Sequence, residues 1–199
     1  MMFISPPRKR IVLASGSPRR RDLVKMMGLK FELAVPEIRE DLVPRAKPSS
    51  LVVELALAKA LSLIGKFPNA AILGADTVVV LDGKILGKPR DRSDARAMLR
   101  TLSGRTHTVY TGLALVDVPT GLRETCCEKS LVTMKKINNE EIDRYLATGE
   151  PMDKAGSYGI QGFGAVFIKH IDGCFFNVMG LPVGRLYDML KDLSKKLGR

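Results

Sequence analysis

The segment from Ala71 to Leu81 constrains the fold more than any other part of this 199-residue chain. It is a near-continuous run of apolar and β-branched residues, interrupted by one carboxylate, Asp76. A run of this kind is typical of a strand that is buried within a sheet covered by helices. Asp82-Gly83 then predicts a tight hairpin turn into a short strand at Lys84 to Leu86.

Strand-turn-helix units precede this strand. Residues 10–14 predict a short buried strand, residues 15–18 a turn, and residues 19–27 a helix that Ser17 caps and Gly28 ends. Further expected elements are a strand at 31–35, a helix from Ser49 or Ser50 to Pro68, a helix from Ser93 to Gly104, and two hairpin strands within 106–136 around Pro119-Thr-Gly121.

The last third of the chain adds both kinds of element. Asn138 and Glu141 predict a capping box for a helix that runs to Thr148. Strands are expected around Val166 and Phe176, and Leu181-Pro182 opens the closing helix. Because hairpins alternate with strand-turn-helix units, we expect an α/β protein with a mixed, curved central sheet flanked by helices.

Composition excludes several classes of protein. With 45% apolar residues the chain is too hydrophobic for a disordered protein, and its length suits a single domain over residues 1–199. No apolar stretch approaches the roughly 20 residues that cross a bilayer, and no secretory h-region follows the basic residues near the N-terminus. The three cysteines form no metal-binding spacing. We therefore expect a cytoplasmic protein without a membrane partner.

The net charge of +11 is concentrated at the two ends of the chain. Residues 1–50 contain 11 Lys and Arg against 5 Asp and Glu, and residues 185–199 contain 5 against 2. Basic ends suit solubility, a nucleic-acid contact or one wall of a phosphate site. The arginines at 19–21 favour the phosphate site, because they directly follow a strand and a tight turn.

The segment Ser15-Gly-Ser-Pro-Arg-Arg20 has the features of a phosphate cradle. A helix N-terminus presents unpaired N–H groups, the hydroxyls of Ser15 and Ser17 can donate, and Arg19 and Arg20 can bind oxygens in pairs. The spacing is not that of a P-loop. Helix capping by the serines and solvation of the arginines is the competing interpretation.

Asp76 is the strongest candidate for a catalytic carboxylate, because a charge within an apolar strand must be paired or used. Glu40 lies in a charged loop, and Lys59 and Lys88 are isolated cations that would separately suit a surface. Together these side chains supply what metal-assisted attack on a phosphate needs: oxygen ligands for a divalent ion, cations for a polyphosphate and a base for water.

A glycine-rich segment, Asp153 to Gly162, permits close approach of backbone to a ligand, although an ordinary connection has the same composition. Its glycines do not match the dinucleotide fingerprint, and no helix start follows them. His107 and His170 lie far apart in sequence and predict no catalytic triad.

Six motifs in this order resemble those of the Maf family of nucleotide pyrophosphatases, over about residues 10–190. They are Ala14-Ser-Gly-Ser-Pro-Arg-Arg20, Gly74-Ala-Asp-Thr-Val78, Leu86-Gly-Lys-Pro89, Leu102-Ser-Gly-Arg-Thr-His107, Gly149-Glu-Pro-Met-Asp-Lys-Ala-Gly-Ser-Tyr-Gly-Ile-Gln-Gly162 and Val178-Met-Gly-Leu-Pro182. The resemblance implies an elongated fold of two lobes around a cleft, like that of inosine triphosphate pyrophosphatases. It also implies hydrolysis of nucleoside triphosphates to monophosphate and pyrophosphate with Mg²⁺ or Mn²⁺, and a link to septum formation.

The same resemblance assigns residues. Asp76 takes the position of the general base, and Glu40 the acidic position of a motif that reads Ile38-Arg39-Glu40 here. The resemblance makes Glu40 a substrate-binding residue and makes Glu40 and Asp76 the expected metal ligands. The phosphate-binding positions of the family fall on Ser15, Ser17, Arg19, Arg20, Lys59 and Lys88. Arg39 stands where the family usually has an acid, which leaves a metal-binding role for that position in doubt.

Substrate choice is implied by three positions that separate two branches of the family. Arg19, Thr77 and Gln161 match the branch that acts on dTTP, UTP and modified uridine triphosphates rather than on 7-methyl-GTP. An amide such as that of Gln161 can pair with the carbonyl and imide N–H of a pyrimidine. We expect these three residues to set base choice.

Two alternatives remain at this point. One is a non-enzymatic nucleic-acid-binding or division-regulating protein that uses its basic ends, although these ends hold few aromatic residues for base stacking. The other is a purine-directed pyrophosphatase. For the preferred function, the expected partners are nucleoside triphosphates and a second copy of the chain in a homodimer, without stable nucleic acid.

Overall fold

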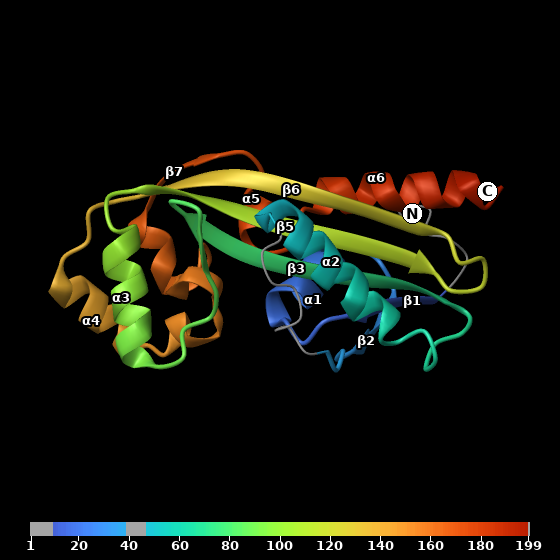
Figure 1. Cartoon of the computed structure of the whole chain (residues 1–199), viewed down its shortest axis with the longest axis horizontal. Coiled ribbons are helices and arrows are strands. Elements are labelled where there is room, and N and C mark those ends of the chain that lie inside the picture. The colour runs from blue at the N-terminus through green and yellow to red at the C-terminus, as the bar shows by residue number, and fades with distance from the viewer. Residues whose placement is uncertain (1–9, 39–46, 199) are drawn as a thin grey trace. The chain divides into compact units, whose positions relative to one another are not determined.

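A seven-stranded mixed sheet organises the described residues, 10–38 and 47–198, in this computed structural model (Figure 1). Its elements in chain order are β1 (Arg10–Ala14), α1 (Pro18–Met26), β2 (Phe31–Ala34), α2 (Pro48–Leu61), β3 (Ala70–Leu81), β4 (Lys84–Leu86), α3 (Arg92–Leu102), β5 (Thr106–Asp117), β6 (Arg123–Met134), α4 (Asn139–Ala147), the 3₁₀ turns η2 (Glu150–Asp153), η3 (Ala155–Ser157) and η4 (Gly162–Phe167), β7 (Ile168–Asp172), α5 (Phe175–Val178) and α6 (Val183–Lys196).

The strands follow the order β2-β1-β3-β5-β6-β7, and β4 pairs with β3. β1 is parallel to both β2 and β3, whereas the β3–β4 and β6–β7 pairs are antiparallel. The expected mixed sheet with flanking helices is therefore confirmed. In the parallel pair Ala14 is the register partner of Gly74, so that Ser15 and Asp76 both lie just beyond this point.

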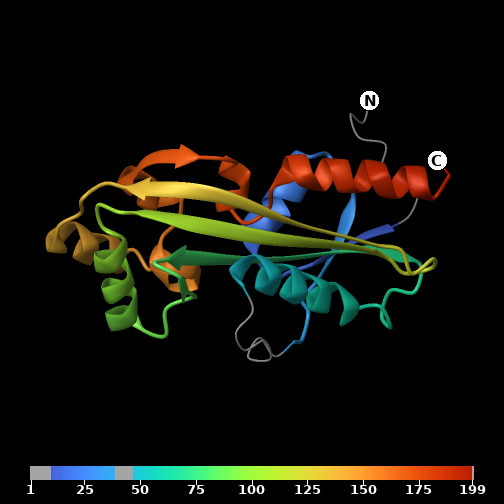
Figure 2. The same ribbon diagram turned by 45° about the horizontal axis from the view of Figure 1, so that its top comes forward.

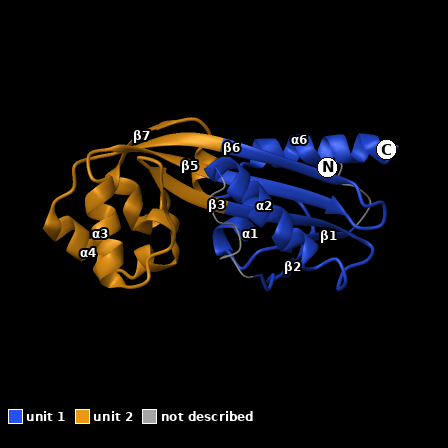
Figure 3. Cartoon of the chain, viewed as in Figure 1, with its two compact units in different colours: residues 1–76, 111–128, 180–199 blue, residues 77–110, 129–179 orange. Residues whose placement is uncertain are grey.

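The chain divides into two compact units (Figure 3). The family resemblance likewise implies two lobes. One consists of residues 1–76, 111–128 and 180–199, and the other of residues 77–110 and 129–179. β3, β5 and β6 each contribute residues to both units, and the division in β3 falls between Asp76 and Thr77.

In the first unit α2 and α6 cover opposite faces of the sheet (Figure 2). α6 lies along β6, where Arg185 pairs with Glu128 and the Cys126 Sγ lies 3.4 Å from the Met189 Sδ. Strands and α2 enclose an apolar cluster between them. It comprises Val12, Ala14, Ala60, Leu63, Ala70, Ile72 and Val116.

The second unit has its own core, formed by strand ends, α3, α4 and the 3₁₀ turns. Its buried members include Val79, Leu81, Leu99, Val109, Met134, Tyr145, Tyr158 and Phe167. The capping box of α4 is confirmed, since the Asn138 side chain accepts from the Glu141 N–H and the Glu141 carboxylate accepts from the Asn138 N–H.

Several expected boundaries and elements are wrong. α2 begins at Pro48 with Lys47 as its N-cap, where a cap at Ser49 or Ser50 is expected, and α3 begins at Arg92, one residue before the expected Ser93. Val166 lies in η4 and Phe176 in α5, and the strand of this region is β7. A short apolar run does not distinguish a strand from a tight helical turn, which explains the last two errors.

The longest described helices, α2 and α6, each have 14 residues. Of the helices that the structure describes, none combines the length and the apolar character required to span a membrane.

Candidate functional site

The junction between β1 and α1 holds the predicted phosphate cradle. Ser15 is buried, and its hydroxyl accepts from the N–H of Ser17 at 3.1 Å. The Ser17 hydroxyl in turn accepts from the N–H of Arg20, and Pro18 occupies the first helical turn. The predicted Ser17 cap is confirmed. The first turn of α1 contains no acidic residue, so the positive end of the helix dipole is not offset there.

The two predicted arginines follow directly in α1. Both are half-buried. The Nε of Arg20 donates to the carbonyl oxygen of Gly180 at 2.8 Å, which ties the start of α1 to the segment that precedes α6. This bond orients the guanidinium group, whose planar set of N–H donors suits phosphate oxygens.

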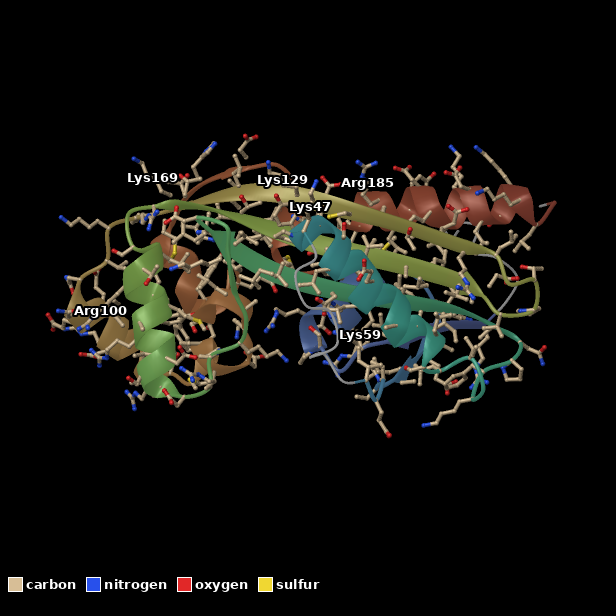
Figure 4. All side chains as sticks on the ribbon, viewed as in Figure 1. Lys47, Lys59, Arg100, Lys129, Lys169 and Arg185 are labelled. Carbon is tan, nitrogen blue, oxygen red and sulfur yellow. The ribbon has the colours of Figure 1, made fainter. Side chains whose placement is uncertain are left out.

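A buried ion pair joins α2 to β3. The Nζ of Lys59 donates to the Oδ1 of Asp76 at 2.5 Å, and each residue is less than a tenth exposed. Lys59 lies on α2 (Figure 4) and is separated from Asp76 by 17 positions in the chain. Because a buried charge requires a partner, the pair accounts for how the apolar strand tolerates a carboxylate.

Two glycines allow α2 to lie close enough for this contact. A Cβ at Gly74 of β3 would overlap the carbonyl group of Ala56, and a Cβ at Gly112 of β5 would overlap the carbonyl group of Val52. The absence of side chains at these positions brings the backbone of α2 against the sheet, so that Lys59 reaches Asp76.

The remaining predicted residues within the described ranges belong to the second unit. Thr77 is half-buried and follows Asp76 in β3, whereas Lys88 and Gln161 are exposed. The carbonyl oxygen of Gly87 accepts from the N–H of Gly156 at 3.0 Å. This bond places Lys88 beside the glycine-rich segment, so the structure brings two of the sequence motifs together.

Glu40 and Arg39 lie outside the described residues, and the acidic position of this motif stays a prediction. Within residues 10–38 and 47–198, no group of three or more His, Cys, Asp or Glu side chains could hold a metal ion. Burial raises the pKa of the Cys126 thiol to about 11, which leaves it protonated and unreactive at neutral pH.

Sequence reasoning did not assign a role to Glu150 or Tyr145. The carboxylate of Glu150 accepts hydrogen bonds from the N–H groups of Phe163 and Gly164 and from the hydroxyl of Tyr145. Glu150 stands in the longest motif, but only the fold shows that two of its partners lie 13 and 14 residues further along the chain. An acid directly before a proline at a turn was the one available signal.

The fold and this site define a mixed α/β protein with a buried carboxylate–lysine pair beside a basic helix start. The model of the family described as "Maf-like protein" matches residues 10–193. The chain therefore belongs to the Maf-like protein family, and the resemblance of its motifs is confirmed.

Relatives are similar over nearly their whole length. A protein of Pelotomaculum thermopropionicum named dTTP/UTP pyrophosphatase is 50% identical over 183 residues, which are 92% of this chain and 96% of the relative. A Bacillus cytotoxicus protein of the same name is 47% identical over 186 residues, 94% of this chain and 96% of the relative. Among solved structures, a HAM1 protein from Coxiella burnetii is 15% identical, with a TM-score of 0.47 over 96% of this chain and 98% of that one.

Proposed function

We propose that the protein hydrolyses dTTP, UTP and modified uridine triphosphates to the monophosphate and pyrophosphate. The observation that carries this proposal is the buried contact between Lys59 and Asp76, which lies in the same unit as the helix start at Ser15 to Arg20. The names of the relatives and their identity of 45–50% support the reaction and the substrate class.

In this mechanism Asp76 accepts a proton from a water molecule whose oxygen attacks the α-phosphorus. The bond from that phosphorus to the bridging oxygen breaks, and its electron pair leaves with pyrophosphate. Lys59 orients the carboxylate through the 2.5 Å contact. The first-turn N–H groups of α1 and the side chains of Arg19 and Arg20 bind the phosphate oxygens.

A divalent cation fits this site as a companion of the substrate. Mg²⁺ is commonly held by one or two carboxylates together with substrate phosphates and water. Of the two predicted ligands, Asp76 lies among the described residues and Glu40 does not, and the described part of the chain offers no cluster that would form a protein cage. Asp76 would hold the ion, which supplies charge neutralisation on the phosphate oxygens.

The finer assignments belong to the same proposal. Lys88 binds phosphate from its position beside the glycine-rich segment, and Arg19, Thr77 and Gln161 select the base. The protein acts as a single domain, forms a homodimer, and works in the cytoplasm, where it removes modified pyrimidine triphosphates before polymerases use them. Mass measurement of the purified protein in solution tests the homodimer.

The deciding experiment resolves the products from a panel of canonical and modified triphosphates, with Mg²⁺ and separately with Mn²⁺. We expect monophosphate and pyrophosphate from dTTP and UTP, and a loss of roughly 10²- to 10⁴-fold in kcat for Asp76→Asn. Asp22→Asn is the matched control, because Asp22 is an exposed carboxylate on α1 that pairs with Arg21. Its turnover should be unchanged.

Other outcomes would redirect the assignment. Diphosphate and orthophosphate as products would show that the wrong bond had been chosen. Preferential turnover of 7-methyl-GTP would indicate the purine-directed branch. No turnover of any triphosphate, together with nucleic-acid binding that weakens steeply with salt, would favour the binding protein.

A further inference from the structure

The loop that carries Gln161 is held from both sides by Glu150 and Tyr145. The N–H groups of Phe163 and Gly164 donate to the Glu150 carboxylate at 2.8 and 3.1 Å. On the other side of Gln161, the N–H of Gly159 donates to the hydroxyl oxygen of Tyr145 at 3.0 Å. That hydroxyl donates to Glu150 at 2.8 Å, so that one connected network fixes both flanks of Gln161.

The glycines of this loop are explained by the same network. A Cβ at Gly162, whose φ is +79°, would overlap the Glu150 carboxylate. A Cβ at Gly164 would lie 2.6 Å from the Tyr145 hydroxyl, and one at Gly159 would lie 3.0 Å from Glu150 Oε1. The groups that approach these glycines closely therefore include two side chains of the protein itself, those of Glu150 and Tyr145.

Gln161 itself is exposed at the apex of this fixed loop. Its backbone is extended, with φ of −103° and ψ of 154°, and its side chain makes no capping hydrogen bond to η4. A fixed backbone with an available amide is a preorganised arrangement, which lowers the entropy lost when a ligand binds.

The Tyr145 hydroxyl keeps its proton at neutral pH. Burial, and then the hydrogen bond to Glu150, raises the pKa of Tyr145, so its hydroxyl remains a donor. The carboxylate oxygens of Glu150 accept hydrogen bonds from three donors, of which the Tyr145 hydroxyl is one.

We propose that Glu150, acting with Tyr145, is a positioning residue that sets base selectivity by fixing the place of Gln161. This inference rests on the proposed triphosphate hydrolysis and on the role of Gln161 in it. Glu150 need not touch the nucleotide, because its effect passes through the backbone of the loop.

Glu150→Gln is the sharpest test, since it keeps the shape of the side chain but turns one acceptor oxygen into a donor that faces N–H groups. We expect the ratio of kcat/KM for dTTP to that for dCTP to fall by roughly tenfold, which corresponds to about one hydrogen bond. The change should appear mainly in KM for dTTP. Inhibition by pyrophosphate, which carries no base, should be unchanged.

A double-mutant cycle separates positioning from general stability. If Glu150 acts through Gln161, then Glu150→Gln should change the dTTP to dCTP ratio in the native background but not in the Gln161→Ala background. The matched control is Glu140→Gln, which alters an exposed carboxylate of α4 paired with Arg144 and should leave the ratio unchanged.

Each other result has a distinct meaning. A Glu150→Gln protein that is less stable but keeps its base selectivity would reduce Glu150 to a structural residue and overturn the inference. If that variant does not fold, Tyr145→Phe provides the test, because it removes the acceptor for Gly159 and should lower the same ratio. Absence of dTTP turnover in the unaltered protein would instead refute the proposed function.

Discussion

At the scale of single residues, the energetics of the site depend on charges that are removed from water. Lys59 and Asp76 are 9% and 8% exposed, and a buried ion in such surroundings is tolerated only with a partner and further hydrogen bonds. The pair is therefore better understood as a feature retained for function than as a source of stability. A base held in this way meets its substrate in a fixed orientation.

His107 provides the clearest dependence of stability on pH. Its Nε2 lies 2.7 Å from the Tyr158 hydroxyl, and its buried Nδ1 has no hydrogen-bond partner among the described residues. Burial lowers its pKa from 6.5 to about 4. Between these values the unfolded state binds more protons than the folded state, so the stability from this residue is complete above pH 6.5 and is lost as the pH falls toward 4.

We therefore expect the free energy of unfolding to fall by about 3 kcal/mol from this residue over that interval, at 1.36 kcal/mol for each pKa unit. Urea unfolding at a series of pH values measures how the free energy of unfolding changes with pH. His107→Gln should remove the part of this pH dependence that comes from His107. His170→Gln, at an exposed position of β7, should keep the slope of the native protein. Equal slopes for both variants would contradict the assignment.

Some of these residue contacts were predictable and others were not. The Ser17 cap and the Asn138 capping box follow from local spacing, and both are confirmed. The contact of Lys59 with Asp76 was not predictable from spacing, because it depends on how α2 packs on β3. The burial of Asp76 follows from the apolar run around it, whereas that of Lys59 depends on the same packing.

At the scale of elements, the close packing of α2 on the sheet controls the site. Gly74→Ala would place a Cβ against the carbonyl group of Ala56, at the turn of α2 that precedes Lys59. Overpacking of this kind typically costs 1–3 kcal/mol, and we expect a loss of about 2 kcal/mol in unfolding free energy. We also expect a lower kcat, because the helix must move away from Asp76.

Gly184→Ala is the matched control for this experiment. Gly184 lies in α6, and a Cβ there would meet no atom within 4 Å. Alanine at such a helical position should stabilise the protein by about 0.5–1 kcal/mol and leave kcat unchanged. A Gly74→Ala protein with native stability and activity would show that α2 does not require this close approach.

The sequence predicted well the elements with a long apolar run, such as β3, or with clear end signals, such as α1. β3 differs from its expected range by one residue at its start, and α1 by one residue at each end. The segment around Val166 was missed because tertiary contacts decide its conformation. Glu150 binds the first N–H groups of η4, and this favours a helical turn over a strand.

At the scale of the whole molecule, three strands link the two compact units. β3, β5 and β6 each pass from one unit into the other without a break in the strand. Linkers between independent domains are usually exposed, whereas Asp76 is buried and Thr77 half-buried where β3 passes from one unit into the other. Continuous strands favour the proposed single domain.

We expect the two units to unfold together in urea. The chain has no tryptophan, so Phe67→Trp in the first unit and Phe176→Trp in the second each report on one unit without background. Both positions are half-buried, which makes the fluorescence sensitive to unfolding. The two fluorescence midpoints should coincide with each other and with the loss of far-ultraviolet circular dichroism.

The reason for coincidence is that melting either unit would interrupt the hydrogen-bonded ladder of β3, β5 and β6 partway along each strand. The N–H and C=O groups left at the interruption would lose partners within the same sheet, and the remaining unit would be destabilised. The contrary result is a difference between the two fluorescence midpoints that exceeds the difference of either one from the circular dichroism midpoint of the native protein. Such a difference would define two separately folding domains. In that event the base Asp76 and the neighbouring Thr77 would belong to bodies of different stability.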